Sequence, residues 1–410
     1  MKSTAHTAAR KKAVLILLYA TMFFFAISST MVGILNPDIM TAYHLTNTEI
    51  SMMSTLQQMG SIIAMVSAAF LSDRFPKLRM ILIFFAVYTV LLFSIGLVPP
   101  YVLLLALFLV LGVTNSWLNM LLSAYISEKY MENRSSVMNI LHAFYSLGSL
   151  AGPIYAGFVK SLSSSWSRSF YFLSLMCLVL TLIILTVTIP VKERDAEKAK
   201  SGLMTGFKAL LSDRLFWLLS FFAAFFMIYQ TAVSTWIALY LENGLKVENS
   251  RLSEMALTLF WLGIMLSRFL QPILSRLFDY RKYLAAVLPT SAILYIVAFI
   301  VQNPVFITIV LFLSGLLLGA VYPTVISLAC ERYPMLSGTV TSLLSIINAA
   351  ISMGITIFIG FMMDHIGYRT GIFLLPIMLI ISCFFYCLYR NSMKHLLTPG
   401  RRYSGSQDAS

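Results

Sequence analysis

Two ionisable side chains, His142 and Arg268, stand inside long apolar stretches of the chain. A charged group in a hydrocarbon environment is costly and rare, and it usually faces a cavity or a partner. Arg268 could anchor an anionic or hydroxyl-rich solute or form part of a gate, and it could equally clamp two helices together. His142 could carry a proton because an imidazole titrates near neutral pH, or it could be a hydrogen-bonded packing residue.

Amide and aromatic side chains accompany these two residues within the apolar stretches. Asn139, His142 and Tyr145 are spaced by three and therefore share one helix face. Amides and hydroxyls donate and accept hydrogen bonds in fixed directions, which suits a neutral polyol or sugar, although single amides also join helices to one another. The residues expected to line a substrate cavity are Gln57 (or its neighbour Gln58), Asn115, Asn119, Asn139, His142, Tyr145, Gln230, Trp236, Trp261, Arg268, Tyr322 and Asn348.

The elements that must position these side chains are long apolar segments separated by short loops. A helix needs about 20 apolar residues to cross a hydrocarbon core, and only helices or closed barrels satisfy their backbone hydrogen bonds there. The sequence therefore predicts an all-α membrane protein with twelve transmembrane helices. The expected spans are 13–35, 50–71, 79–98, 101–125, 135–159, 168–190, 215–240, 253–274, 284–301, 304–329, 338–362 and 370–389.

The net charge of +13 reports topology and does not indicate a nucleic-acid partner. Most of the Lys and Arg residues lie in the two termini and the even-numbered loops, an asymmetry that favours cytoplasmic termini. The expected organisation is a six-helix bundle at 1–190, a basic cytoplasmic linker at 191–214, a second six-helix bundle at 215–390 and a cytoplasmic tail at 391–410.

The two halves of the chain share a glycine register. A shift of 203 residues places Gly60 on Gly263 and Gly112 on Gly315, and it places the pair at 157–158 on the pair at 360–361. These coincidences indicate an internal repeat, so that the two bundles would be pseudo-symmetric. Parallel repeats about an axis along the membrane normal are a known transporter design, with the substrate held between them near the midplane.

The turn after the second span carries a charged motif. Leu71–Arg79 reads LSDRFPKLR, which resembles the cytoplasmic loop motif of the major facilitator superfamily, although Ala69 and Pro76 replace two of its glycines. The resemblance implies that its charged residues lock the cytoplasmic ends of the helices together in one state. The residues of this expected cytoplasmic gate are Asp73, Arg74, Lys77 and Arg79.

Further stretches are similar to the sugar-transporting branch that includes the fucose permeases. Met138–Gly148 followed by Gly152-Pro153 resembles a run found in the fifth span of that branch, and Phe260–Arg268 and Gly319–Thr324 continue the likeness. Members of that branch usually carry an interior carboxylate for cation coupling. In this chain every Asp and Glu lies in a loop or at a span end, so the usual proton-coupling group is not expected.

These observations favour a secondary transporter that moves a small polar solute, such as a sugar, across the cell membrane by alternating access. The alternative is efflux of amphipathic, drug-like compounds, because Gly148-x-x-x-Gly152-Pro153 also resembles a motif of drug-exporting antiporters. A nutrient sensor without transport activity is a further alternative. We expect no enzymatic activity, no metal site and no cofactor. The expected partners are a small-molecule substrate, a coupling cation if transport is coupled, and the lipid bilayer around a multi-pass monomer.

Overall fold

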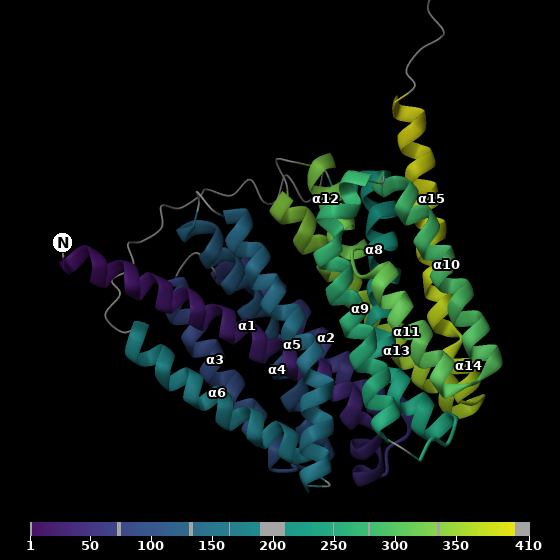
Figure 1. Ribbon diagram of the computed structural model, residues 1–410, viewed down its shortest axis with the longest axis horizontal. Helices are drawn as coiled ribbons and strands as arrows, with labels where there is room; N and C mark the ends of the chain where they lie inside the picture. The colour runs from purple at the N-terminus through teal and green to yellow at the C-terminus, as the bar shows by residue number, and fades with distance from the viewer. Residues whose placement is uncertain are drawn as a thin grey trace, which may run out of the picture.

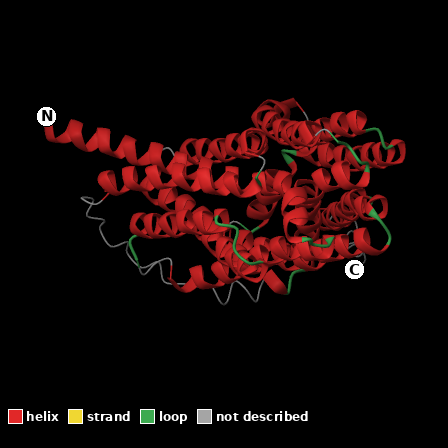
Figure 2. Cartoon of the chain, turned by 90° about the horizontal axis from the view of Figure 1, so that it is seen from below, coloured by secondary structure: helices red, strands yellow, loops and turns green. Residues whose placement is uncertain are grey.

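The computed structural model of this chain describes residues 2–71, 75–130, 134–163, 165–188, 210–248, 250–277, 279–333 and 337–397. The described residues form helices joined by short turns, and no strand occurs among them (Figure 2). Ten segments in this part of the chain are long and apolar enough to cross a membrane. Two further helices, of 25 and 30 residues, have the length to do so.

The described residues between 2 and 188, which we call the first part of the chain, form six consecutive helices; those from 210 to 397 are the second part. The six helices are α1 (Lys2–Tyr43), α2 (Asn47–Leu71), α3 (Lys77–Gly96), α4 (Tyr101–Lys129), α5 (Arg134–Ser163) and α6 (Trp166–Thr188). Within this group α1 packs against α5, α2 against α4, and α3 against both α4 and α6 (Figure 1).

The second part of the chain is also helical but more interrupted. Its elements are α8 (Arg214–Leu239), the π-helical turn η1 (Tyr240–Gly244), α9 (Ser250–Leu277), α10 (Tyr280–Val301), α11 (Pro304–Leu318), α12 (Val321–Arg332), α13 (Ser337–His365), α14 (Tyr368–Ile372) and α15 (Leu374–Leu397). Here α9 packs against α11, and α15 packs against α8 and α10.

Three helix pairs make the main contacts between the two parts of the chain: α2 with α13, α5 with α9, and α1 with α8. We call the end of the molecule that carries the α1–α2 turn at residues 44–46 the distal end. The opposite end, near the start of α1 and the end of α15, we call the terminal end (Figure 1). These two ends are used below to describe where the contacts between the two parts lie.

The segment expected to be one span at 304–329 is two helices. Asn303 begins α11 by accepting a hydrogen bond from Phe306 N, and Pro304 occupies the first turn, where no amide donor is needed. α11 ends at Leu318, and α12 follows after Gly319 and Ala320. Pro323 accounts for part of this interruption because a proline has no N–H to bond the carbonyl four residues earlier, which is that of Gly319.

Glycines allow the closest helix approaches, and they do so in the same register in both parts. A methyl group on Gly60 would overlap Leu109 O on α4, and one on Gly112 would overlap Gln57 O on α2. In the second part, a methyl group on Gly263 would overlap Phe312 O, and one on Gly315 would overlap Phe260 O. Each contacted residue of the second pair lies 203 positions after its counterpart in the first pair. The crossing of α2 with α4 is therefore repeated by the crossing of α9 with α11.

Candidate functional site

Arg268 on α9 reaches across to the first part of the chain. Its Nη1 donates a hydrogen bond to Ser146 Oγ on α5 at 3.1 Å, and its Nε donates to Gly319 O at 3.4 Å. Eighteen residues separate Arg268 from the distal start of α9, so it lies roughly 27 Å along that helix. The guanidinium thus stands deep within the helical bundle and contacts both parts.

The acceptor at Gly319 is available because of the helix interruption. Pro323 cannot donate to Gly319 O, so this carbonyl has no α-helical partner and turns to the arginine. The same chemistry recurs on α5, where Pro153 cannot donate to Ser149 O, and Thr30 Oγ1 on α1 fills that role at 3.0 Å. Prolines inside these helices therefore create acceptors for contacts between helices.

Three of the sequence-predicted cavity residues gather around the guanidinium. His142, Tyr145 and Tyr322 all lie close enough to interact electrostatically with Arg268. Tyr322 also lies near Ser345 on α13. The His142 side chain is exposed, whereas Arg268 and Tyr145 are partly buried.

The amides predicted to line the cavity occupy different environments. Asn115 and Gln230 are buried, whereas Asn119 and Asn139 are exposed. The buried Oδ1 atoms of Asn115 and of Asn348 accept no hydrogen bond from the described residues. Such unpartnered acceptors can receive a donor from a bound solute.

The remaining predicted cavity residues are mostly enclosed. Trp236 is completely buried and Trp261 nearly so, and neither indole N–H has a hydrogen-bond acceptor among the described residues. Gln57 is half-buried and lies where the α2 backbone meets Gly112. Their role in substrate binding stays a prediction.

Sequence reasoning missed Ser146 and Gly319 as partners of Arg268. Ser146 follows Tyr145 directly and donates back to His142 O, four residues earlier. Its helical spacing from His142 was therefore a usable signal. The Gly319 carbonyl could have been found from Pro323 by counting four residues back along the helix.

The distal contact between α2 and α13 is made by one carboxylate. Asp364 Oδ1 accepts from Asn47 N and Asn47 Nδ2, each at 2.8 Å. Its Oδ2 accepts from Thr48 N at 2.8 Å and from Thr48 Oγ1 at 2.6 Å. Asp364 therefore caps the first turn of α2 from the other part of the chain, where free backbone N–H groups favour an anion. The helices also touch directly, because a methyl group on Gly360 would lie 2.6 Å from Asn47 O.

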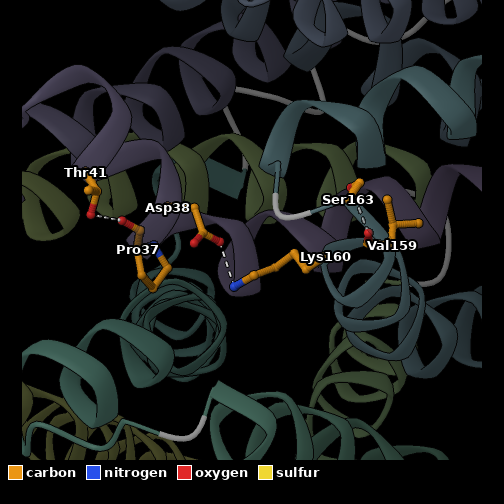
Figure 3. Close-up of polar contacts among 6 residues, drawn as sticks. All are labelled: Pro37, Asp38, Thr41, Val159, Lys160 and Ser163. Carbon is orange, nitrogen blue, oxygen red and sulfur yellow. Dashed lines mark hydrogen bonds and ion pairs between the residues drawn. The ribbon is translucent and has the colours of Figure 1, made fainter.

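The distal contact between α5 and α9 is built from several charges. Lys160 on α5 pairs with Asp38 on α1, their Nζ and Oδ2 atoms lying 2.6 Å apart (Figure 3). Lys160 also interacts electrostatically with Glu242 on η1 and Glu254 on α9. The Glu254 carboxylate lies over Gly157, where a methyl group would overlap it.

A third distal contact joins α1 to α8 through the backbone. Asn36 Nδ2 donates to Thr235 O at 3.1 Å, and Gly33 packs so closely that a methyl group on it would overlap Ser234 O. Together with the contacts at Asp364 and Lys160, this means that three helix pairs meet through polar or backbone groups at the distal end.

The expected gate lies at the terminal end, and the structure describes only part of it. Lys77 is buried and pairs with Glu128 on α4, a contact within the first part of the chain. Arg79 is exposed. Asp73 and Arg74 lie outside the described residues, as do the linker residues up to 209 and the tail from residue 398.

Comparison with known proteins identifies the family. A family model described as "Major Facilitator Superfamily" matches residues 18–357. The chain belongs to the major facilitator superfamily. It is therefore a multi-pass membrane transporter, as its loop motif and apolar helices predict.

Individual relatives are distant but extend over most of the chain. The glucose/mannose transporter GlcP of Bacillus subtilis is 22% identical over 331 residues, which cover 79% of this chain and 82% of that protein. The cis,cis-muconate transport protein of Acinetobacter baylyi is 23% identical over 308 residues, covering 71% and 73%. A crystal structure of a D-xylose-proton symporter superposes with a TM-score of 0.75 at 12% identity, covering 91% of this chain and 96% of that one. The last likeness concerns the fold alone.

Proposed function

We propose that this protein is a secondary transporter that moves a small polar solute across the cell membrane by alternating access, with sugars as the first candidates. The moving parts would be two six-helix bundles at 1–190 and 215–390, connected by a cytoplasmic linker at 191–214. The observation that carries the proposal is the contact between the two parts. At the distal end they meet through hydrogen bonds and through the electrostatic contacts of Lys160 with Glu242 and Glu254, all of which can break and re-form. Deeper in the bundle they meet at Arg268.

The repeated glycine crossings support the two-bundle arrangement. Residues at equivalent positions, 203 apart in the sequence, make the α2–α4 and α9–α11 crossings. Two bundles of like construction can rock about a site held between them. The excess of Lys and Arg in the termini and even-numbered loops favours cytoplasmic termini, and the distal end would then face outward.

The relatives guide the choice of solute. GlcP is named for glucose and mannose, and the solved symporter for D-xylose and a proton. The second curated relative is named for cis,cis-muconate, an organic anion. Sugars and small organic acids are therefore the solutes to test first, each with and without an imposed cation gradient. Neither curated relative is named as a drug exporter, and we do not extend the efflux alternative to this chain.

Uptake by proteoliposomes tests transport directly. Purified full-length protein should take up a labelled hexose, pentose or organic acid with saturable kinetics, and accumulation above the outside concentration should require a proton or sodium gradient. Gradient-independent equilibration would identify a facilitator. Flux at channel rates without saturation would contradict alternating access.

A reversible crosslink tests the proposed movement at the distal end. Cysteines in place of Asn47 and Asp364, in a chain whose four native cysteines are replaced, should form a disulfide that stops uptake until a reductant is added. The matched control places cysteines at Thr89 and Thr181, whose hydroxyl oxygens lie 3.4 Å apart within the first part of the chain. Crosslinking this control pair should leave uptake intact. Full uptake with the 47–364 crosslink closed would refute the rocking movement.

A further inference from the structure

Among the described residues, all hydrogen-bond partners of the Arg268 guanidinium are neutral groups. The two ion pairs in this part of the chain join Lys77 to Glu128 and Lys160 to Asp38, and neither includes Arg268. The arginine bonds a hydroxyl and a carbonyl, and the side chains that act on it electrostatically are tyrosines and His142. The positive charge of Arg268 thus stands deep in the bundle, and no carboxylate in the described part of the chain balances it.

Such a charge is expensive to maintain for structure alone. Arg268 is partly buried. A charge withdrawn from water without a counter-ion loses hydration and gains no compensating ion pair. A neutral side chain such as glutamine could bond the same hydroxyl at lower cost. The charge is explained if a negative group from outside the chain completes the pair, and guanidinium is suited to this because its planar fork bonds both oxygens of a carboxylate.

The number of positive charges at this position limits the charge that the negative group can carry. One permanent cation lies at this position, and it matches the single charge of a monocarboxylate rather than the larger charge of a phosphate ester or a dicarboxylate. We therefore propose that the transported solute carries one carboxylate, and that this carboxylate binds Arg268 between α5, α9 and α12. The proposal rests on the proposed transport function and names the chemical class of its substrate.

The hydrogen-bond acceptors near Arg268 indicate which other groups the solute carries. Tyr322 lies near Ser345 on α13. Asn348 follows Ser345 by three residues, so Ser345 and Asn348 share a helix face. Asn348 Oδ1 is buried and receives no hydrogen bond from the described residues. An acceptor in that position suits a hydroxyl donor. A hydroxylated monocarboxylate, such as a uronic or aldonic acid, offers both the anion for Arg268 and hydroxyls for Asn348 and the tyrosines.

The test compares sugars that differ only at the carboxylate. Binding of D-glucuronate and D-galacturonate to purified full-length protein is measured against D-glucose and D-galactose by thermal stabilisation and titration. We expect the dissociation constant of the acid to be at least tenfold lower than that of its matched sugar. Arg268→Gln should abolish that preference and leave neutral-sugar binding within about threefold, and Arg268→Lys should give an intermediate preference because it keeps the charge and loses the fork.

Two controls separate binding from folding. Arg168→Gln removes an exposed arginine at the start of α6 and should keep the full preference for the acid. The thermal midpoint of solute-free Arg268→Gln should equal or exceed that of the unmodified protein, since an unbalanced charge has been removed. A drop of several degrees would instead identify Arg268 as a clamp between helices and overturn the proposal.

The outcomes also distinguish this proposal from the proposed transport function. If neutral sugars bind and are taken up as well as the acids, the carboxylate proposal fails and transport stands. If the acid preference persists in Arg268→Gln, the anion site lies elsewhere and the proposal for this residue fails. If neither the acids nor the sugars bind or enter proteoliposomes, the result contradicts both.

Discussion

Two of the three distal contacts between the parts of the chain, α2 with α13 and α5 with α9, are made by different kinds of interaction. Gly360 and Gly157 occupy equivalent positions in the 203-residue repeat and face opposite partners. Gly360 meets backbone atoms of Asn47 and Thr48, and Asp364 beside it accepts four hydrogen bonds from the start of α2. Gly157 meets the flexible carboxylate of Glu254 within a group of charges around Lys160.

This difference indicates that the two equivalent interfaces have different roles. Backbone contact and directed hydrogen bonds make the α2–α13 contact specific in geometry, so it closes in one register. Charge makes the α5–α9 contact adaptable, and the same helix pair carries Arg268 and Ser146 deeper in the bundle. We therefore expect steric changes to affect the first contact most, and ionic conditions to affect the second.

Substituting the two equivalent glycines should have the largest effects on closure of the distal contacts, and the two effects should differ most from each other. Gly360→Ala should disfavour distal closure by about 1–3 kcal/mol, because the added methyl meets rigid backbone. Gly157→Ala should have a clearly smaller effect because the Glu254 side chain can move aside. Spin labels at His44 and Ile366 would report the α2–α13 contact, and labels at Leu162 and Met255 the α5–α9 contact.

Gly354→Ala is the matched control for these measurements. Gly354 lies on the same helix as Gly360, and a methyl group there would meet no atom within 4 Å. It should leave the label distances unchanged. Equal opening by Gly360→Ala and Gly157→Ala would show that the two interfaces are mechanically alike.

Removing the Asp364 carboxylate should have the next largest effect. Asp364→Ala loses the cap on the first turn of α2, which is worth about 1–2 kcal/mol, and it should lengthen the 44–366 distance more than the 162–255 distance. Asp364→Asn keeps one acceptor oxygen and should retain part of the closure. An unchanged 44–366 distance in Asp364→Ala would mean that packing at Gly360 closes this contact unaided.

Removing Lys160, the central cation of the α5–α9 contact, should change the label distances less, and the change should depend on the salt concentration. Lys160→Gln leaves Asp38, Glu242 and Glu254 without their shared positive charge, and their repulsion should lengthen the 162–255 distance. The screening length falls from about 10 Å at 0.1 M salt to about 3 Å at 1 M, so high salt should reverse the change. The opening caused by Asp364→Ala should respond much less to the same salt change.

The smallest effect should come from Asp38. Asp38→Asn removes one half-exposed carboxylate and leaves Lys160 near two others, so we expect less than about 1 kcal/mol. Neither label pair should shift measurably. A large opening in this variant would show that the α5–α9 contact depends on the pairing of Lys160 with Asp38 on α1 (Figure 3) more than on the wider group of charges.

Local patterns in the sequence predicted where most of the helices lie. Every expected span corresponds to a helix, or to two consecutive helices where a proline or a short turn interrupts it, as at Gly319 and Phe373. The glycine register was visible because a close crossing needs a residue without a side chain at both of its positions. The partners across the bundle were not visible in the same way, since Asp364 and Asn47 stand 317 positions apart.

The residues predicted to line a cavity show what such patterns can and cannot predict. The composition of the spans singled out Arg268, His142, Tyr145 and Tyr322, and these four side chains are neighbours in the structure. Trp236 met the same criteria of type and position, but the rotation of α8 buries it completely. Helix rotation is set by packing against several other helices, which no single segment encodes.

The amino-acid sequence by itself determined the all-helical class, the approximate spans, the repeat and the rarity of charge within the spans, because each depends on composition or on spacing within one segment. Only the tertiary structure decided that Arg268 meets a hydroxyl and a freed carbonyl instead of a carboxylate. It also decided that one repeat-related contact is closed by hydrogen bonds to a helix start and the other by charges. Those outcomes depend on the depth and rotation at which distant helices meet, and the free energy of packing the whole bundle sets both.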